Sequence, residues 1–151
     1  MRPITFERRQ TIHRPAIEIS AEIADLTRWP EFNGYAFLPG IESAEYENRT
    51  NDMVGSHIRV HNRDGSSHVE EICEWDAGKR IVMKLHAFTP PLNRLSTHFI
   101  EEWHFEGKDN ATLVTRKFQM FPRQPIARPL LWLISLLFRR AITLHLSEMG
   151  R

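Results

Sequence analysis

Cysteine is nearly absent from this sequence, and the common cofactor-binding motifs are absent altogether. The chain has 151 residues and one cysteine, Cys73, which excludes an internal disulfide bond and is typical of a reducing compartment. None of its 7 glycines forms a GxGxxG or GxxxxGK(S/T) pattern for phosphate binding. The chain also has no HExxH pair, CxxC pair or GxSxG serine motif. We therefore expect no cofactor and no metal.

The sequence has no excess of charge and no long hydrophobic run. Its 20 lysines and arginines are scattered among 19 acidic residues, so we expect no nucleic-acid partner. The first ten residues contain four charged side chains and no apolar core, unlike a signal peptide. The longest apolar stretch, Pro129 to Phe138, is ten residues, whereas a membrane-spanning helix needs about 20. We expect no transmembrane segment and a cytoplasmic protein.

The composition and the order of the elements predict one α+β domain over residues 1–151. With 41% hydrophobic and 26% charged residues, the chain can bury a core of its own. A strand is expected over Ile4 to Ile12, a short helix from Pro15 that ends at Trp29-Pro30, and then a run of hairpins. The segment Pro125 to Met149 has helical spacing and would cover the apolar face of the sheet.

The hairpin turns predict which side chains share the apolar face. A two-residue turn at Asp64-Gly65 sets Val60 opposite Val69 and Ile58 opposite Glu71. The same phase continues through Cys73, which we interpret as a core residue, to Trp75. A later turn within 107–110 predicts the pairs Phe99–Phe118, Glu101–Arg116 and Trp103–Val114.

The C-terminal helix is expected to turn one broad apolar face inward. The predicted inner residues are Ile126, Leu130, Leu133, Ile134, Leu137, Phe138, Ala141, Ile142 and Leu144. Ser135 falls on the predicted outer face, as do Trp132 and Leu136, which are unexpected among polar residues. These two side chains could be covered by another segment of the chain, form a homodimer contact, or touch an anionic membrane surface beside Arg139 and Arg140.

The histidines do not predict a metal site. His57 and His61 are expected to point outward, and residues four apart on a strand are separated by about 13 Å. His61 and His68 would approach each other across the first hairpin, but no third ligand is evident. Solvent-exposed histidines are the simpler interpretation.

Several short motifs resemble those of the START-like, or SRPBCC, superfamily and its polyketide cyclase/dehydrase and lipid-transport group. The matching residues are Ile12-x-x-Pro15, Ile23-Ala-Asp25-x-x-x-Trp29-Pro-x-Phe32, Pro39-Gly-Ile41, Val54-Gly55, Glu71-x-x-x-Trp75-Asp76, Glu101-x-Trp103, Thr115-Arg116 and Ala141-x-x-x-His145-Leu146. The resemblance implies a helix-grip fold. In that fold a curved antiparallel sheet of six or seven strands wraps around the long C-terminal helix, with short helices after the first strand. It also implies a cavity between sheet and helix, as in lipid carriers and aromatic cyclases of the group.

We therefore expect a protein that binds a hydrophobic or amphipathic small molecule, such as a lipid, polyketide or aromatic compound. The aromatic loop from Trp29 to Gly40 and the apolar loop from Phe88 to Leu95 would gate the cavity. The predicted ligand-binding residues are Trp29, Phe37, Ile58, Val60, Val69, Glu71, Trp75, Met83, Leu85, Phe99, Glu101, Trp103, Val114, Arg116, Phe118, Leu133 and Leu137.

Two other functions remain open from the sequence. Glu101 or Glu71 could be the acid/base of a cyclase or dehydratase, with Arg116 stabilising an anion. The same charges could equally be a structural ion pair, since structural pairs also perturb pKa values. We lean towards a binding protein, because no nucleophile-base pair is readable from the chain. The third candidate is an interaction module that uses Trp132 and Leu136.

Overall fold

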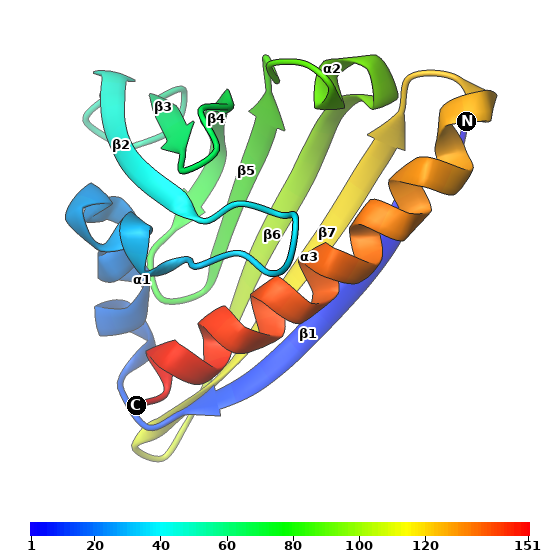
Figure 1. The fold of residues 1–151 in the computed structure, drawn as a ribbon. Helices are drawn as coiled ribbons and strands as arrows, with labels where there is room; N and C mark the ends of the chain where they lie inside the picture. Colours follow the sequence, from blue (N-terminus) through cyan, green and yellow to red (C-terminus); the bar gives the residue numbers. More distant parts are fainter.

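Alternating apolar side chains build a seven-stranded antiparallel sheet in the computed structural model, which describes residues 1–151 (Figure 1). Its elements in chain order are β1 Ile4–Ile12, α1 Ala16–Ala24, the 3-10 helix η1 Leu26–Glu31, β2 Ile41–Asn48, β3 His57–Asn62, β4 Ser67–Asp76, β5 Arg80–His86, α2 Leu92–Leu95, β6 Ser96–Lys108, β7 Ala111–Pro122, the 3-10 helix η2 Pro125–Ala127 and α3 Arg128–Met149. The strand order is β1-β7-β6-β5-β4-β3-β2, so β1 closes onto the last strand. This is the helix-grip architecture expected from the sequence.

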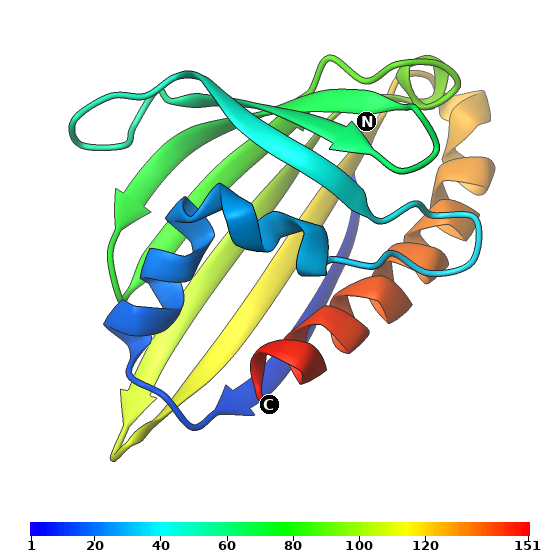
Figure 2. The ribbon, with the colours of Figure 1, turned by 60° about the vertical axis from the view of Figure 1, so that its left-hand side comes forward.

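The long helix α3 lies along one side of the sheet, against β1 and β7 (Figures 1 and 2). The helices α1 and η1 lie at the other side, where η1 packs against β2. The loop between η1 and β2 reaches from there towards α3 in both views. The sheet, these helices and the loop are therefore the elements from which the predicted site would be built.

The β6–β7 hairpin keeps the predicted face but not the predicted pairs. Its turn is the two residues Asp109-Asn110, one position later than expected, and Asp109 adopts a left-handed conformation with a φ of 57°. The register therefore shifts by two residues and pairs Glu101 with Phe118 and Trp103 with Arg116. Because side chains alternate with period two, this shift leaves every inward residue inward. Phe99, Glu101, Trp103, Arg116 and Phe118 are all buried.

The β3–β4 hairpin differs from the prediction by one residue, which changes the face. The Asn62 amide donates to the Ser66 carbonyl at 2.8 Å and closes a loop of three residues, Arg63 to Gly65, in which Gly65 adopts a φ of 88° that favours glycine. Ile58 consequently pairs with Glu70 and not with Glu71. The predictions that Val69 and Glu71 face the cavity are therefore wrong.

Further along β4, a bulge between Ile72 and Glu74 resets the phase. Cys73 is exposed there, so its interpretation as a core residue is wrong. Trp75 returns to the inner side, where it packs against the edge of the core.

The short N-terminal helix begins after Pro15 as predicted, but proline does not end the helical segment. α1 ends at Ala24, and the Asp25 side chain accepts a hydrogen bond from the Thr27 amide at 3.2 Å, which starts η1. Pro30 lies inside η1. Trp29 is therefore fixed on a helical turn, and its indole Nε1 donates to the Ile23 carbonyl at 3.0 Å.

Helix α3 keeps only part of its predicted inner face, since Ile134, Leu137, Phe138, Ala141 and Ile142 face inward as predicted and the rest of that face is turned away. Its buried face includes Leu131, Ser135, Ile142 and Leu146. Ser135 fits there because its hydroxyl donates to the Trp132 carbonyl at 2.5 Å and its small side chain lets the helix approach the sheet. The predictions that Leu130, Leu133, Ile126 and Leu144 face inward are wrong, since all four are exposed.

The same helix is apolar along most of its length. The segment Pro125–Met149 is long and apolar enough to cross a membrane by length and composition alone, and 33% of its most apolar window is buried. The core helix of a globular protein meets the same criterion. Trp132 and Leu136 are 48% and 40% exposed, so no other segment of the chain covers them.

Candidate functional site

A cavity of about 750 Å³ lies between the inner face of the sheet, η1, α3 and the two loops that precede β2 and α2. This volume falls within the range of roughly 300–1,000 Å³ that is usual for small-molecule sites. Of its 35 lining residues, 18 are hydrophobic. The floor residues Met83, Phe99 and Phe118 are at most 2% exposed, so the open volume lies nearer the mouth. There the half-buried side chains of Phe32, Ile134 and Phe138 form the wall.

The structure brings ten of the predicted binding residues to this cavity. They are Trp29, Phe37, Met83, Leu85, Phe99, Glu101, Trp103, Arg116, Phe118 and Leu137. Ile58, Val60 and Val114 are fully buried in the core and do not line the cavity. Val69 and Glu71 lie on the outer face of the sheet, Trp75 lies at the edge of the core, and Leu133 is 52% exposed on the outside of α3. The error for Leu133 belongs to the part of the predicted α3 face that is turned away.

Glu101 and Arg116 form a buried ion pair in the wall. The two side chains are each 6% exposed, and Arg116 Nε donates to Glu101 Oε2 at 2.9 Å. They are diagonal neighbours on β6 and β7, and the length of the arginine spans the offset. Burial raises the pKa of the Glu101 carboxyl, while the charge of Arg116 opposes the rise.

His145 on α3 completes this cluster. Arg116 donates from Nη1 to His145 Nδ1 at 2.8 Å, so Nδ1 carries no hydrogen and the imidazole is neutral. Burial and the arginine charge together lower the pKa of His145 to about 3. His145 belongs to a motif of the family resemblance, but it was not among the predicted site residues. Its contact with Arg116 joins two elements 29 positions apart, which the sequence pattern does not reveal.

Arg116 also lies over the Trp103 ring, with its guanidinium carbon 4.0 Å from the ring centroid. The indole Nε1 of Trp103 is buried and has no hydrogen-bond partner in the protein. A guanidinium has five N–H donors, and the bonds to Glu101 and His145 use three of them. Arg116 therefore keeps two N–H donors for the polar end of a ligand.

A second polar pair lies near the mouth and was missed from the sequence. His68 Nε2 lies 2.9 Å from Glu70 Oε2, and their side chains are 12% and 7% exposed. The negative charge of Glu70 adds to the rise in the pKa of Glu101. His68 was expected beside His61 on the outer face, which is wrong for the same one-residue reason as Glu71. The sequence around Asp64-Gly65 does not distinguish a three-residue loop from the expected two-residue turn, so no signal in the sequence identifies the two residues.

The aromatic loop forms one lip of the mouth. Phe37 is 94% exposed although it borders the cavity. Gly34 adopts a φ of 72°, and a Cβ atom there would lie 2.2 Å from the Leu38 carbonyl oxygen. The loop therefore needs glycine at this position to form the tight Tyr35–Leu38 bridge that presents Phe37.

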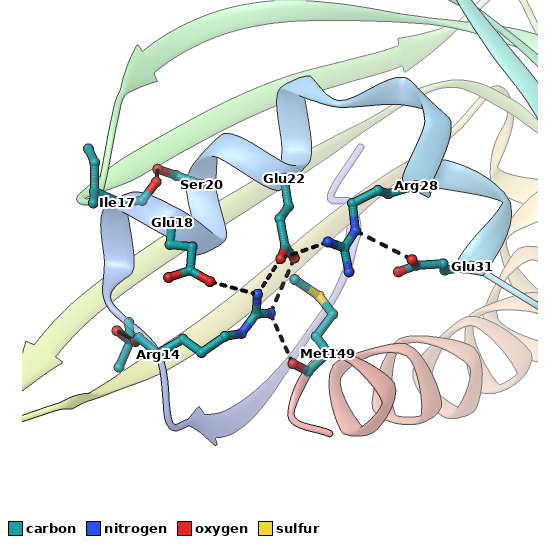
Figure 3. A network of polar contacts seen from close by, with 9 residues as sticks. Arg14, Ile17, Glu18, Ser20, Glu22, Arg28, Glu31 and Met149 are labelled. Atoms are coloured by element: carbon teal, nitrogen blue, oxygen red, sulfur yellow. Dashed lines mark hydrogen bonds and ion pairs between the residues drawn. The ribbon is translucent and has the colours of Figure 1, made fainter.

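A chain of charged side chains links α1 and η1 to the end of α3 (Figure 3), and its members Glu22, Arg28 and Glu31 line the cavity. Arg14 forms an ion pair with Glu22 and donates from Nη2 to the Met149 carbonyl at 3.0 Å. Arg28 lies 3.0 Å from Glu22 and 3.4 Å from Glu31. This belt ties α1 and η1 to the last turn of α3, so the helices on the two sides of the cavity are joined at this end.

Comparison with known proteins agrees with this geometry. A family model described as polyketide cyclase / dehydrase and lipid transport matches residues 3–149. No curated protein sequence matches the chain. A START superfamily protein from Mycobacterium smegmatis is 13% identical with a TM-score of 0.73, covering 97% of this chain and 96% of its own.

Two further solved structures are similar over the whole length. The Zhui aromatase/cyclase from Streptomyces sp. R1128 is 17% identical with a TM-score of 0.72, covering 98% of this chain and 94% of its own. The ginseng major latex-like protein 151 from Panax ginseng is 15% identical with a TM-score of 0.67, covering 100% of this chain and 99% of its own. Identities this low establish the fold alone.

Proposed function

The chain belongs to the polyketide cyclase / dehydrase and lipid transport family, and from that premise we propose that it binds an amphipathic small molecule in the cavity beside α3. The observation that carries the proposal is the composition of the wall. Apolar side chains make up about half of the lining, and one buried cluster, Arg116 with Glu101 and His145, supplies the polar part.

The wall divides into two parts that match such a ligand. Phe32, Ile134 and Phe138 would cover the apolar part of the ligand, where burial is worth roughly 25 cal/mol per Å² before the costs of binding. The free donors of Arg116 would hold a carboxylate, carbonyl or phenol oxygen. Fatty acids and polyphenolic aromatic compounds have this combination of groups.

Filling the cavity tests the proposal. Ile134 lines the cavity and Leu133, its neighbour on α3, is exposed, so Ile134→Trp and Leu133→Trp form a matched pair. The protein would be screened by native mass spectrometry and thermal shift against fatty acids and polycyclic phenols. We expect the wild type and Leu133→Trp to bind the same compounds and Ile134→Trp to lose binding by at least tenfold. Equal binding by both variants, or none by the wild type, would contradict the proposal.

A cyclase or dehydratase activity is the second candidate, favoured by one observation. Glu101 is a buried carboxyl whose pKa is raised by burial, as a proton donor to a bound substrate requires. Similarity in fold to an aromatase/cyclase is consistent with this reading. Glu71 is no longer a candidate acid/base, because it lies outside the cavity.

The variant Glu101→Gln separates the two functions. It keeps the shape and one hydrogen-bond acceptor for Arg116 but removes the titrating proton. A binding protein should retain its ligand affinity within a few fold. An enzyme should still bind a polyketide-like substrate but stop converting it, as followed by mass spectrometry of the product.

A further inference from the structure

Three side chains of metal-ligating type meet on the outer face of the sheet, away from the cavity. His57 lies on β3, Glu71 on β4 and His86 at the end of β5. One ligand atom from each lies within 4.8 Å of the other two. The pairing of adjacent strands produces this arrangement, because His57 stands directly opposite Glu71 and His86 stands opposite Val69, two residues before Glu71.

The surroundings of His57 fix the direction of its ring. Its Nδ1 lies 2.9 Å from Asn48 Oδ1, and the Asn48 amide nitrogen donates to the Gly55 carbonyl at 3.2 Å. The amide oxygen therefore faces the imidazole, and Nδ1 carries the hydrogen. Nε2 is left 3.1 Å from Glu71 Oε1. In a neutral ring two lone pairs face each other there, and either a proton or a metal cation between them converts the repulsion into attraction. An oxygen that holds the other ring nitrogen is also the usual support of a metal-bound histidine.

His86 supplies an independent observation. Its Nε2 is buried and has no hydrogen-bond partner, which is uncommon for a buried polar atom. The ring stands edge-on to that of His57, with centroids 6.4 Å apart. Lys84, opposite Glu71 on β5, adds a positive charge nearby. Because the charge of Lys84 repels a cation, electrostatic attraction alone would not hold a metal ion here. Coordination by the nitrogen lone pairs of the two histidines would be needed.

We propose that His57, Glu71 and His86 bind a divalent transition-metal cation, with Zn²⁺ as the best match. Two imidazoles and one carboxylate are a donor set that zinc prefers, whereas Mg²⁺ and Ca²⁺ prefer oxygen ligands. Tetrahedral zinc with bonds near 2.0–2.1 Å places its ligand atoms roughly 3.3 Å apart. The His57–Glu71 pair already meets this spacing at 3.1 Å. His86 would approach by no more than about 1.5 Å, and water would complete the shell.

The ion would join three neighbouring strands, β3, β4 and β5, none of which lies against α3 along its length. Its effect is therefore on the stability of the folded chain. The proposal does not depend on what the cavity binds, because Glu71 and His86 do not line the cavity.

The test uses full-length, untagged protein freed of metal with a chelator. ZnCl₂ is titrated in by calorimetry, and thermal unfolding is followed with and without zinc, with MgCl₂ as the comparison salt. We expect one zinc per chain, a melting temperature raised by roughly 5–10 °C at a hundredfold excess over Kd, and no shift with magnesium. Absence of zinc binding by the wild type overturns the proposal.

Three variants locate the site. His86→Ala and Glu71→Gln should each weaken zinc binding by at least tenfold. His61→Ala should leave it unchanged, because His61 pairs with Glu45 of β2 at 3.2 Å and belongs to no group of three metal-ligating side chains. Unchanged affinity in His86→Ala and Glu71→Gln overturns the proposal. Should either variant fail to fold, Co²⁺ in the wild type decides: intense visible bands of a four-coordinate ion support the site, and the pale spectrum of hydrated Co²⁺ refutes it.

Discussion

Replacing Arg116 by methionine measures the cost of breaking the buried ion pair from one side. Both partners are 6% exposed, so the variant leaves the Glu101 carboxylate buried without its cation. Breaking a buried pair from one side costs about 3–5 kcal/mol. For a chain of 151 residues this corresponds to a fall in melting temperature of roughly 6–20 °C. Urea unfolding at pH 7 gives the free energy directly.

The pH dependence of the same variant adds an internal check. Burial raises the pKa of Glu101 in the folded state above its ordinary value of 4.5, so protonation favours folding. That stabilising contribution is present at low pH and is lost as the pH rises through the raised pKa. Without Arg116, which opposes the rise, the effect grows. Arg116→Met should therefore recover part of its lost stability between pH 7 and pH 5.

Two controls complete this prediction. The double variant Glu101→Gln with Arg116→Met removes both charges and should be more stable than Arg116→Met alone. Arg59→Met breaks a surface pair with Glu47, whose side chains are 31% and 44% exposed, and should cost less than about 1 kcal/mol. A loss below about 1 kcal/mol for Arg116→Met, or a double variant no more stable than the single one, would refute the reasoning.

Three further predictions concern single side chains. The pKa of His145 is lowered from an ordinary 6.5 to about 3, so the free energy of unfolding is highest above pH 6.5 and decreases as the pH falls towards 3. His145→Gln should reduce the slope of this decrease by up to about 1.4 kcal/mol per pH unit, as measured by urea unfolding at several pH values. An unchanged slope contradicts the prediction. Phe37→Ala should speed ligand release in stopped-flow measurements with stability within about 0.5 kcal/mol, because Phe37 is 94% exposed; equal release rates argue against a gate. If exposed Trp132 and Leu136 form a homodimer contact, Trp132→Ser should shift sedimentation to the monomer, whereas a wild type monomeric at all concentrations excludes the contact.

The architecture was predictable because it depends on patterns that survive small errors. Alternation in β6 and β7 identifies an inward face whether the turn is at Lys108 or Asp109, since a shift of two residues returns each side chain to the same side. The family motifs then indicated the order of strands and helices. Glu101 and Arg116 were predicted correctly as inward neighbours for this reason.

The predictions that were wrong depend on the exact position of a single residue in a turn or on a helix face. A three-residue loop and a two-residue loop at Asp64-Gly65 read alike in sequence, yet they decide whether Glu70 or Glu71 enters the cavity. Hydropathy also placed Ser135 outside, because a serine that satisfies its hydroxyl within its own helix behaves as a small apolar residue. The outer cluster of His57, Glu71 and His86 escaped notice because it needs the correct register of three strands together.

The cavity beside α3 affects the heat capacity of unfolding of the whole chain. The apolar side chains of Phe32, Ile134 and Phe138 line the cavity and are only half-buried, so part of the apolar surface on this side of the core stays uncovered. A guest in that volume would remove this surface from water. Unfolding of the loaded protein should then show a larger heat-capacity change than unfolding of the empty one. The difference in heat-capacity change between the two forms would thus measure the apolar surface that the ligand covers, even before the ligand is identified.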